Sequence, residues 1–370
     1  MFIKFSVIFV KKINLGRENY MKNRNAVRLP AEWEQHDATL IAWPANREDW
    51  PGKFTPIQWV YGEIVRYLSP NEKIWIVVQN AAHKKSAERV FWKNYVDPSN
   101  IQFIVKKTDR GWMRDSSPAF VKRKNKTEAV HFLFNGWAKY DNWKLDRKIP
   151  EQISKTLNLP LTIAKYNDRH VVLEGGAIDS NGNGTLLTTE ECLLDEKTQT
   201  RNPGFTKSDY EAVFNKYLGI EKIIWLGKGI TGDDTHGHVD DLCRFVNEKT
   251  VVLCREENPH DENYKLLNEN AERLQSETTA SGSKLEVISL PMPSPMKFDG
   301  MKLPASYANF YIANGMVLVP TFNDEKDRTA LGILSELFPE RKVIGIHAVD
   351  LVWGLGTLHC LSHEIPGEIN

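Results

Sequence analysis

Short apolar runs separated by turn residues predict the strands of this chain. Four pairs of runs are joined by tight turns, and the turn at 179–184 (DSNGNG) is the clearest, because Asn and Gly tolerate a positive φ. Single short strands are expected at Thr39–Trp43 and Leu358–Leu361. The expected pairs are Ser117–Val121 with Thr127–Phe134, Val171–Ile178 with Thr185–Thr189, Asp241–Val246 with Thr250–Cys254, and Tyr307–Ile312 with Met316–Pro320.

Amphipathic stretches lie between these strands. Tyr210, Val213, Phe214 and Tyr217, for example, follow the i, i+3, i+4, i+7 spacing that places apolar side chains on one face of a helix. The expected helices are Pro56–Leu68, Ala81–Asn94, Lys148–Leu157, Thr206–Leu218, Asn263–Glu277 and Arg328–Phe338.

The strand pairs and helices recur at a nearly constant interval. One landmark per unit can be chosen: Trp43, Asp115, Glu174, Asp240, Tyr307 and Cys360, with successive separations of 72, 59, 66, 67 and 53 residues. Such a period predicts an α/β fold built by radial or solenoid repetition. A doubly wound parallel sheet is the alternative, but the tight hairpins disfavour it because parallel strands need long crossovers.

Composition excludes several classes of protein. The 370 residues carry 48 basic and 48 acidic side chains, which argues against binding nucleic acid through bulk positive charge. Apolar residues make up 41%, and no run approaches the ~20 residues of a membrane span. No linker appears, so a single domain is expected over 26–370. Residues 1–25 are interpreted as an extension that is disordered or a mis-assigned start, since Met21 stands just before the globular sequence begins.

The four cysteines are too sparse for a disulfide framework and include no CxxC pair. Reduced thiols in a cytoplasmic protein are expected.

Four clusters could carry chemistry. They are Asp109–Pro118, with an Arg-Asp pair before a strand; Leu173–Gly176, a Glu followed by two glycines; Gly232–Asp241, the densest polar cluster; and Gly354–His363, a glycine-rich approach to Cys360. A structural salt bridge, a solvated turn or a buried cysteine would explain each one alone. Together, three carboxylates, one His and one thiol suit a planar cation attacked at carbon, and a guanidinium group fits that description.

The cluster at 232–241 leaves two interpretations open. His236, His238 and Asp240 have spacing typical of some zinc sites, but the next expected ligand position holds Asp241. Alternatively, His238 and Asp240 would lie two apart on a strand and face one side, where His238 could transfer protons beside a carboxylate.

The chain resembles the agmatine deiminases of the Porphyromonas-type peptidylarginine deiminase family, in the guanidine-modifying pentein superfamily. The resemblance extends from Leu29 to Pro366. It is carried by LPAEWEQH (29–36), AWP (42–44), WMRD (112–115), FNGW (134–137), LEGG (173–176), LLTTEECLL (186–194), THGHVDD (235–241), PASYANFYIAN (304–314) and LHC (358–360).

The resemblance implies a five-bladed, pseudo-symmetric α/β propeller, the pentein fold, and a role for each matching residue. Cys360 would be the nucleophile and His238 the general acid and base. Asp115, Glu174 and Asp240 would hold the guanidinium and assist proton transfer, and Trp112 would pack on the substrate.

The implied reaction converts agmatine to N-carbamoylputrescine and ammonia in putrescine and polyamine synthesis. It would proceed through a covalent thiouronium intermediate on the cysteine. No metal or organic cofactor is expected, because a thiol and an acid–base group supply the chemistry. The expected partner is the small-molecule substrate, with no nucleic acid and no membrane, and homo-oligomerisation is left open.

Departures from the family pattern keep alternatives open. Leu355 and Thr357 stand where Gly and Asn are common, His363-Glu364 replaces Gln-Gln, and Ser117 replaces a Gly. A deiminase of free or peptidyl arginine would need an Arg for the α-carboxylate, and Arg147, Arg201 and Arg244 are candidates. A zinc hydrolase is a more remote alternative. A non-catalytic pentein-fold binding protein is disfavoured because such proteins lack the catalytic set.

Overall fold

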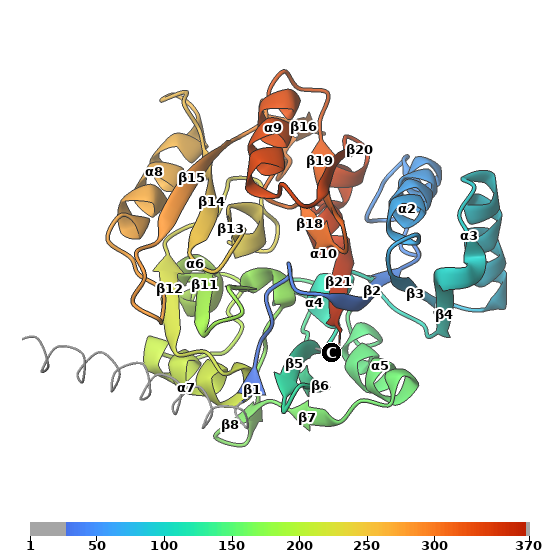
Figure 1. Cartoon of the computed structure of the whole chain (residues 1–370), viewed down its shortest axis with the longest axis horizontal. Helices are drawn as coiled ribbons and strands as arrows, with labels where there is room; N and C mark the ends of the chain where they lie inside the picture. The colour runs from blue at the N-terminus through green and yellow to red at the C-terminus, as the bar shows by residue number, and fades with distance from the viewer. Residues whose placement is uncertain (1–26, 368–370) are drawn as a thin grey trace, which may run out of the picture.

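A computed structural model describes residues 27–367. The expected N-terminal extension at 1–25 lies outside the described residues. Within them, five sheets follow one plan, in which a first strand pairs antiparallel with a second, and the second pairs parallel with a third (Figure 1). A turn suffices for the first pairing, whereas the second needs a crossover, and a helix supplies it in most units.

The strands of the five sheets are β1 (Val27–Arg28), β5 (Ala119–Arg123), β6 (Lys126–His131) and β7 (Leu161–Ile163); β10 (Asp179–Ser180), β11 (Thr185–Thr189) and β12 (Lys222–Leu226); β13 (Cys243–Phe245), β14 (Thr250–Arg255) and β15 (Glu286–Pro291); β18 (Tyr311–Ala313), β19 (Met316–Thr321) and β20 (Lys342–His347); and β21 (Ser362–Pro366), β2 (His36–Ala42), β3 (Lys73–Val78) and β4 (Ile101–Val105). Two-stranded sheets add β8 (Lys165–Tyr166) with β9 (Arg169–His170), and β16 (Lys297–Phe298) with β17 (Met301–Lys302).

The fifth sheet joins the two ends of the described chain. Strand β21 pairs antiparallel with β2, which places Leu40 opposite His363. Figure 1 shows the red C-terminal strand beside the blue N-terminal one, with the longer helices around the outside of the sheets. The last strand therefore completes a sheet that the first long strand begins.

The predicted helices are confirmed within one to three residues at each end. They are α2 (Phe54–Leu68), α3 (Ala81–Lys93), α5 (Ile149–Leu157), α7 (Lys207–Leu218), α8 (Glu262–Leu274) and α9 (Asp327–Leu337). Local signals explain this success, as α7 shows: Thr206 and Asp209 form a capping box at its start, and Gly219 ends it with a left-handed φ of 71°. No helix in 27–367 is long and apolar enough to cross a membrane.

Three strand predictions are wrong in whole or in large part. Of the expected Tyr307–Ile312, only Tyr311 and Ile312 belong to a strand, β18. Leu358–Leu361 is the short helix α10, because the backbone N–H of His359 and that of Cys360 both point at the side-chain oxygen of Asn309, a partner far away in the sequence. Most of Val171–Ile178 is not a strand either. Gly175–Ala177 forms a 3-10 turn (η4), and the strand of that pair is confined to Asp179–Ser180.

The sequence patterns also missed the third strand of each unit. Lys222–Leu226 is an example: it contains apolar residues but follows a helix without a hairpin turn, so nothing local identifies it. Its register comes from parallel pairing with β11, which places Leu187 opposite Ile224.

Gly219, which ends α7, lies close to Val27 at the start of the described residues. Gly219 has a φ of 71°, and a Cβ atom there would lie 1.9 Å from the carbonyl oxygen of Val27. Gly204 has a similar φ of 79°, but a Cβ atom there would meet nothing within 4 Å. A substitution at Gly204 therefore measures the cost of backbone strain alone, whereas one at Gly219 measures strain together with a steric clash.

We expect Gly219→Ala to lower the free energy of unfolding by about 3 kcal/mol or more, measured by urea denaturation. Gly204→Ala should cost only the left-handed backbone penalty of about 1–2 kcal/mol. Equal losses in the two variants would contradict the close approach of Val27 to this turn.

Candidate active site

Cys360 lies at the base of a pocket of about 450 Å³. It belongs to α10, immediately before β21, and is only 5% exposed. Apart from one basic residue, Arg110, the charged and large side chains that line the pocket are acidic or aromatic: Glu48, Asp49, Trp112, Asp115, Trp137, Tyr140, Asp141, Asp234, Phe298 and Trp353. Trp112, the residue expected to pack on a substrate, lies here, with its ring 5.4 Å from that of Trp50.

The thiol of Cys360 lies between an amide and a carboxylate. Asn309 Nδ2 donates to Sγ at 3.1 Å, and Sγ donates to Asp240 Oδ2 at 3.7 Å. Burial raises the pKa of Cys360 well above its usual value, and three carboxylates add to this effect: Asp240, Asp241 and Asp115. The Asn309 bond lowers this pKa but is outweighed. The neutral thiol is therefore the stable form until a positive charge comes close.

His238 is surrounded by carboxylates. Its Nδ1 lies 3.9 Å from Asp115 Oδ1 and 4.0 Å from Asp240 Oδ1. Its Nε2 lies 3.8 Å from Glu174 Oε2. Burial by itself lowers the pKa of His238, but the Asp115 charge and the adjacent Cys192 and Glu174 raise it well above its usual value. The imidazolium form of His238 is therefore favoured. Neither of its ring nitrogens has a hydrogen-bond partner among the described residues.

Asp115 is held in place by two donors. Trp137 Nε1 donates to Oδ2 at 2.9 Å, and the backbone N–H of Gly176 donates to Oδ1 at 3.0 Å. Burial raises the pKa of Asp115 to about 6, although the charge of His238 acts in the opposite sense. Asp115 comes from the short helix α4 (Met113–Ser116), so the WMRD segment contributes both a pocket wall and a carboxylate.

Glu174 is fully buried and paired with Arg201. The Nε of Arg201 lies 3.2 and 3.3 Å from its two carboxylate oxygens. Burial raises the pKa of Glu174, but Arg201 and His238 outweigh it and lower the pKa to about 2. Glu174 is therefore ionised across the physiological range.

Gly176, the second glycine of the LEGG segment, leaves room for the side chains of His238, Asp115 and Asp240. A Cβ atom on Gly176 would lie 2.5 Å from His238 Nδ1 and 3.0 Å from an oxygen of both Asp115 and Asp240. Only glycine fits here without moving the charged side chains.

The structure brings together the five predicted catalytic residues. Asp115 and Cys360 line the pocket with Trp112, and the fully buried Glu174, His238 and Asp240 lie next to them. One detail of the prediction is wrong. His238 and Asp240 do not lie on a strand: His238 precedes the 3-10 turn η5 (Val239–Asp241). Asp233 fixes that loop by accepting the backbone N–H of Gly237 and His238.

The zinc ligand set is not gathered. His236 Nε2 bonds Asp195 Oδ2 at 2.9 Å, whereas His238 is fully buried among the carboxylates. In residues 27–367, the groups of potential ligands with adjacent donor atoms are Glu174, Cys192 and His238, and Asp240, Asp241 and Cys360. Neither group includes His236.

Sequence reasoning assigned no role to Asn309, Trp137 or His359. Asn309 donates to the Cys360 thiol, Trp137 orients Asp115, and His359 bonds Asp240. Each lies within a segment that carries the family resemblance, but no local pattern marks an asparagine or a tryptophan as a second partner of a catalytic group.

Comparisons with known proteins agree with this geometry. The profile of the family described as Porphyromonas-type peptidyl-arginine deiminase matches residues 28–366. The chain belongs to this family. It is 32% identical over 373 residues to an agmatine deiminase of Medicago truncatula, covering 91% of this chain and 96% of that protein. It is 31% identical over 362 residues to one of Ectopseudomonas mendocina, covering 91% and 95%.

Solved structures extend the likeness to three dimensions. A structure described as the agmatine deiminase of Enterococcus faecalis catalysing its reaction has a TM-score of 0.85 and 29% sequence identity, and the match covers 94% of this chain and 98% of that one. This member of the family therefore has the pentein fold, with mixed helix and strand content.

We expect the Glu174–Arg201 pair to stabilise the fold in a pH-dependent way. The pKa of Glu174 is about 2 in the folded protein against an ordinary value of 4.5, so the stabilisation is fully present above pH 4.5 and is lost as the pH falls through 2. A difference of this size corresponds to roughly 3 kcal/mol. Arg201→Gln should lower the free energy of unfolding by about that amount at pH 7 and by less below pH 4, measured by urea denaturation.

Lys207→Gln is the matched control, because it breaks an exposed pair with Glu190. Its cost should stay below about 1 kcal/mol. If Arg201→Gln costs no more than this control, or if its cost does not shrink in acid, the assignment of Glu174 as a permanently charged group is wrong.

Proposed function

We propose that this protein is an agmatine deiminase that hydrolyses agmatine to N-carbamoylputrescine and ammonia, as a cytoplasmic step in putrescine synthesis. The observation that carries the proposal is the position of the Cys360 thiol, which lines the pocket with Asp115 and bonds Asp240, next to a buried imidazolium that lies within 4.0 Å of Asp115, Glu174 and Asp240. Such a site binds a planar cation and places a nucleophile at its carbon. The family relationship supports the same reaction.

We further infer that the five sheets are the blades of a pseudo-symmetric propeller, and that residues 26–370 form one catalytic domain. The shared strand plan of the sheets and the closing pair of β21 with β2 support this arrangement. The loops that follow the sheets would then meet near the axis, where the candidate catalytic residues are gathered.

The charge of the pocket favours agmatine over arginine. Both agmatine and arginine carry a positively charged amine in addition to the guanidinium. Arginine also carries a negatively charged α-carboxylate, which agmatine lacks. Arg110 is the one cation among the described residues that line the pocket, and the acidic residues there are Glu48, Asp49, Asp115, Asp141 and Asp234. Arg110 is already bonded to Asp49 at 2.8 Å and to Asn142 at 2.9 Å.

The other candidate arginines are also engaged. Arg201 bonds Glu174, and Arg244 bonds Asp179 and Glu32 within the core. Arg147 lies over the ring of Trp143 and does not line the pocket. An α-carboxylate would therefore meet carboxylates rather than a free guanidinium.

In the proposed mechanism, the substrate itself activates the nucleophile. A guanidinium held by Asp115, Glu174 and Asp240 brings a positive charge beside Cys360 and offsets the carboxylates that favour the neutral thiol. The thiol then releases its proton to solvent water, and the thiolate attacks the guanidinium carbon and forms the S–C bond. His238 donates its proton to the departing nitrogen, the C–N bond breaks, and ammonia leaves.

Hydrolysis completes the cycle. The neutral His238 takes a proton from a water molecule, whose oxygen attacks the thiouronium carbon. The S–C bond then breaks and returns the electron pair to sulfur, which takes up the remaining hydroxyl proton. This step releases the ureido product and restores the thiol and the protonated His238. The thiol and the imidazole supply all of the acid–base and nucleophilic chemistry in these steps.

Purified, reduced protein should form a ureido product from agmatine at least 100-fold more efficiently, in kcat/KM, than from free arginine or a peptide ending in arginine. A colorimetric ureido assay measures all three substrates. Cys360→Ala should lose turnover and still bind agmatine, as measured by calorimetry, because the carboxylates remain.

Each outcome separates the candidate functions. Product mainly from an arginine substrate would keep the site and overturn the substrate assignment. Wild-type turnover by Cys360→Ala would exclude the thiol mechanism. Activity that depends on stoichiometric zinc and disappears with a chelator would favour a zinc hydrolase instead.

A further inference from the structure

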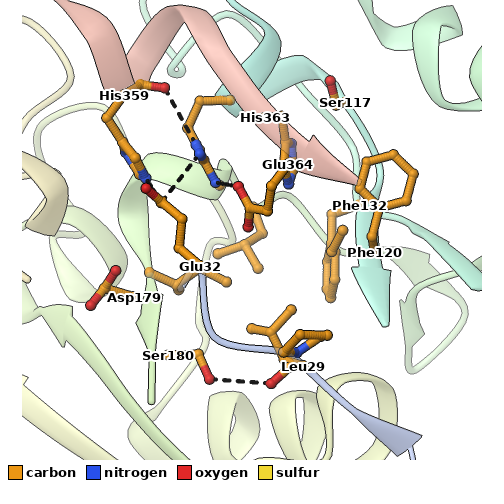
Figure 2. A pocket seen from close by; sticks show the side chains of 16 residues that line it. Leu29, Glu32, Ser117, Phe120, Phe132, Asp179, Ser180, His359, His363 and Glu364 are labelled. Atoms are coloured by element: carbon orange, nitrogen blue, oxygen red, sulfur yellow. Dashed lines mark hydrogen bonds and ion pairs between the residues drawn. The ribbon is translucent and has the colours of Figure 1, made fainter. Parts of the chain in front are cut away.

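Glu32 is a buried acidic residue without a role in the mechanism. It belongs to the LPAEW segment at 29–33, which carries the family resemblance, and it is 7% exposed. It lines a second pocket of about 60 Å³, together with His359, Arg114, His363 and Glu364 (Figure 2).

The second pocket is separate from the Cys360 pocket. The two share no lining residue, and consecutive residues face different sides: Arg114 and His359 line the second pocket, whereas Asp115 and Cys360 line the first. Helices α4 and α10 therefore form the wall between them. A residue that lines only the second pocket acts on the substrate through this wall and not by contact.

A chain of short bonds crosses this wall. His359 Nδ1 lies 2.7 Å from Asp240 Oδ2, and His359 Nε2 lies 2.7 Å from Glu32 Oε2. Figure 2 shows the His359 ring and the Glu32 carboxylate side by side. His359 and Asp240 are completely buried, so no solvent competes for these bonds.

Glu32 is itself fixed from three directions. Arg244 Nη2 donates to its Oε2 at 2.7 Å, and Arg114 Nη2 donates to the same oxygen at 3.4 Å. The backbone N–H of Ile312 donates to Oε1 at 2.6 Å. The carboxylate cannot rotate without breaking these bonds, so it is a rigid support for His359.

The ring proton of His359 is assigned from its partners. A ring nitrogen and a carboxylate oxygen 2.7 Å apart need a proton between them. Burial and the charges of Arg114 and Arg244 lower the pKa of His359 well below its usual value, so the ring is neutral and carries one proton. Burial raises the pKa of Asp240, but the bond from His359 and the charges of His238 and Arg244 outweigh it and lower that pKa, so Nδ1 is the donor to an ionised Asp240.

We propose that Glu32 and His359 are positioning residues that orient Asp240 for the substrate, an inference that rests on the proposed deiminase function. The bond from His359 occupies Asp240 Oδ2, while Oδ1 is buried with no hydrogen-bond partner among the described residues. Oδ1 is therefore the oxygen held ready for a guanidinium N–H. The N-terminal LPAEW segment thereby controls a catalytic carboxylate through a histidine that precedes the nucleophile.

Two variants at one position test the proposal. Asn places its amide nitrogen near the position of Nδ1, so His359→Asn keeps the donor to Asp240 and loses the link to Glu32. Gln places its nitrogen near Nε2, so His359→Gln does the reverse. A charge-assisted bond is worth about 10- to 100-fold, so we expect kcat/KM for agmatine to fall about 100-fold in His359→Gln and about tenfold in His359→Asn.

The pH profile gives a readout that a purely structural role would not move. Loss of the donor raises the pKa of Asp240, so the acid limb of kcat/KM should move to higher pH in His359→Gln and stay in place in His359→Asn. The other groups that face Asp240 are unchanged in both variants: His238, Arg244, Cys360, Asp241 and Asp115. Equal losses in the two variants, or unmoved acid limbs, would overturn the proposal.

His363→Gln is the matched control. His363 lines the same second pocket, and its Nδ1 lies 3.4 Å from the carbonyl oxygen of Met113, without a bond to Asp240. We expect it to change thermal stability but to leave kcat/KM within about twofold. Addition of Glu32→Gln to His359→Asn should cause little further loss, because the link between the two is already broken.

A measurement on the wild-type protein tests the His359–Asp240 bond without an activity assay and without a variant. In protein with nitrogen-15-labelled histidine, His359 Nδ1 should carry a proton that exchanges slowly with solvent. An unprotonated Nδ1 would overturn the proposal even if agmatine is hydrolysed. A protonated Nδ1 in protein that turns over no guanidine compound would contradict the proposed function and leave the geometry of this chain intact.

Discussion

Burial of several ionised carboxylates around one histidine is the constraint on which the centre of this protein depends. An unpaired charge removed from water costs several kcal/mol, so each buried carboxylate needs a cation or a set of donors. Arg201 supports Glu174, whereas Arg244 and Arg114 support Glu32. His238 is the cation that the remaining carboxylates share. More negative than positive side chains surround the Cys360 thiol. The binding of a cation would therefore balance the charge of the pocket.

The sequence predicted the groups that are gathered at this centre better than the groups that support them. Asp115, Glu174, His238 and Cys360 stand in short polar or glycine-rich clusters that can be found locally, whereas their roles were implied by the family resemblance and stay predictions. Asn309 and His359 cannot be recognised in this way, because their roles exist only after segments tens or hundreds of residues apart have come together. Nor does a pattern reveal that the chain around His238 is a turn rather than a strand.

The same contrast holds for the fold. Helices contain their own signals, such as the Thr206 cap, and their ends were predicted within three residues. The turn residues at 179–184 located a hairpin, but not the bounds of its first strand, Asp179–Ser180. The parallel third strands and the helical turn α10 depend on distant partners, so their positions could not be predicted from local pattern. Repetition at a nearly constant interval was visible in the sequence, whereas the pairing of the last strand with β2 was not.

That last pairing has a consequence for the order in which the protein assembles. Cys360 stands two residues before β21, and one edge of β2 has its partner only in β21. During synthesis this edge stays open until β21 has left the ribosome, and an open edge is a site of aggregation. The same event that covers the edge also brings Cys360 against Asn309 and Asp240. The thiol is thus placed beside Asn309 and Asp240 at about the moment when the open strand edge is covered.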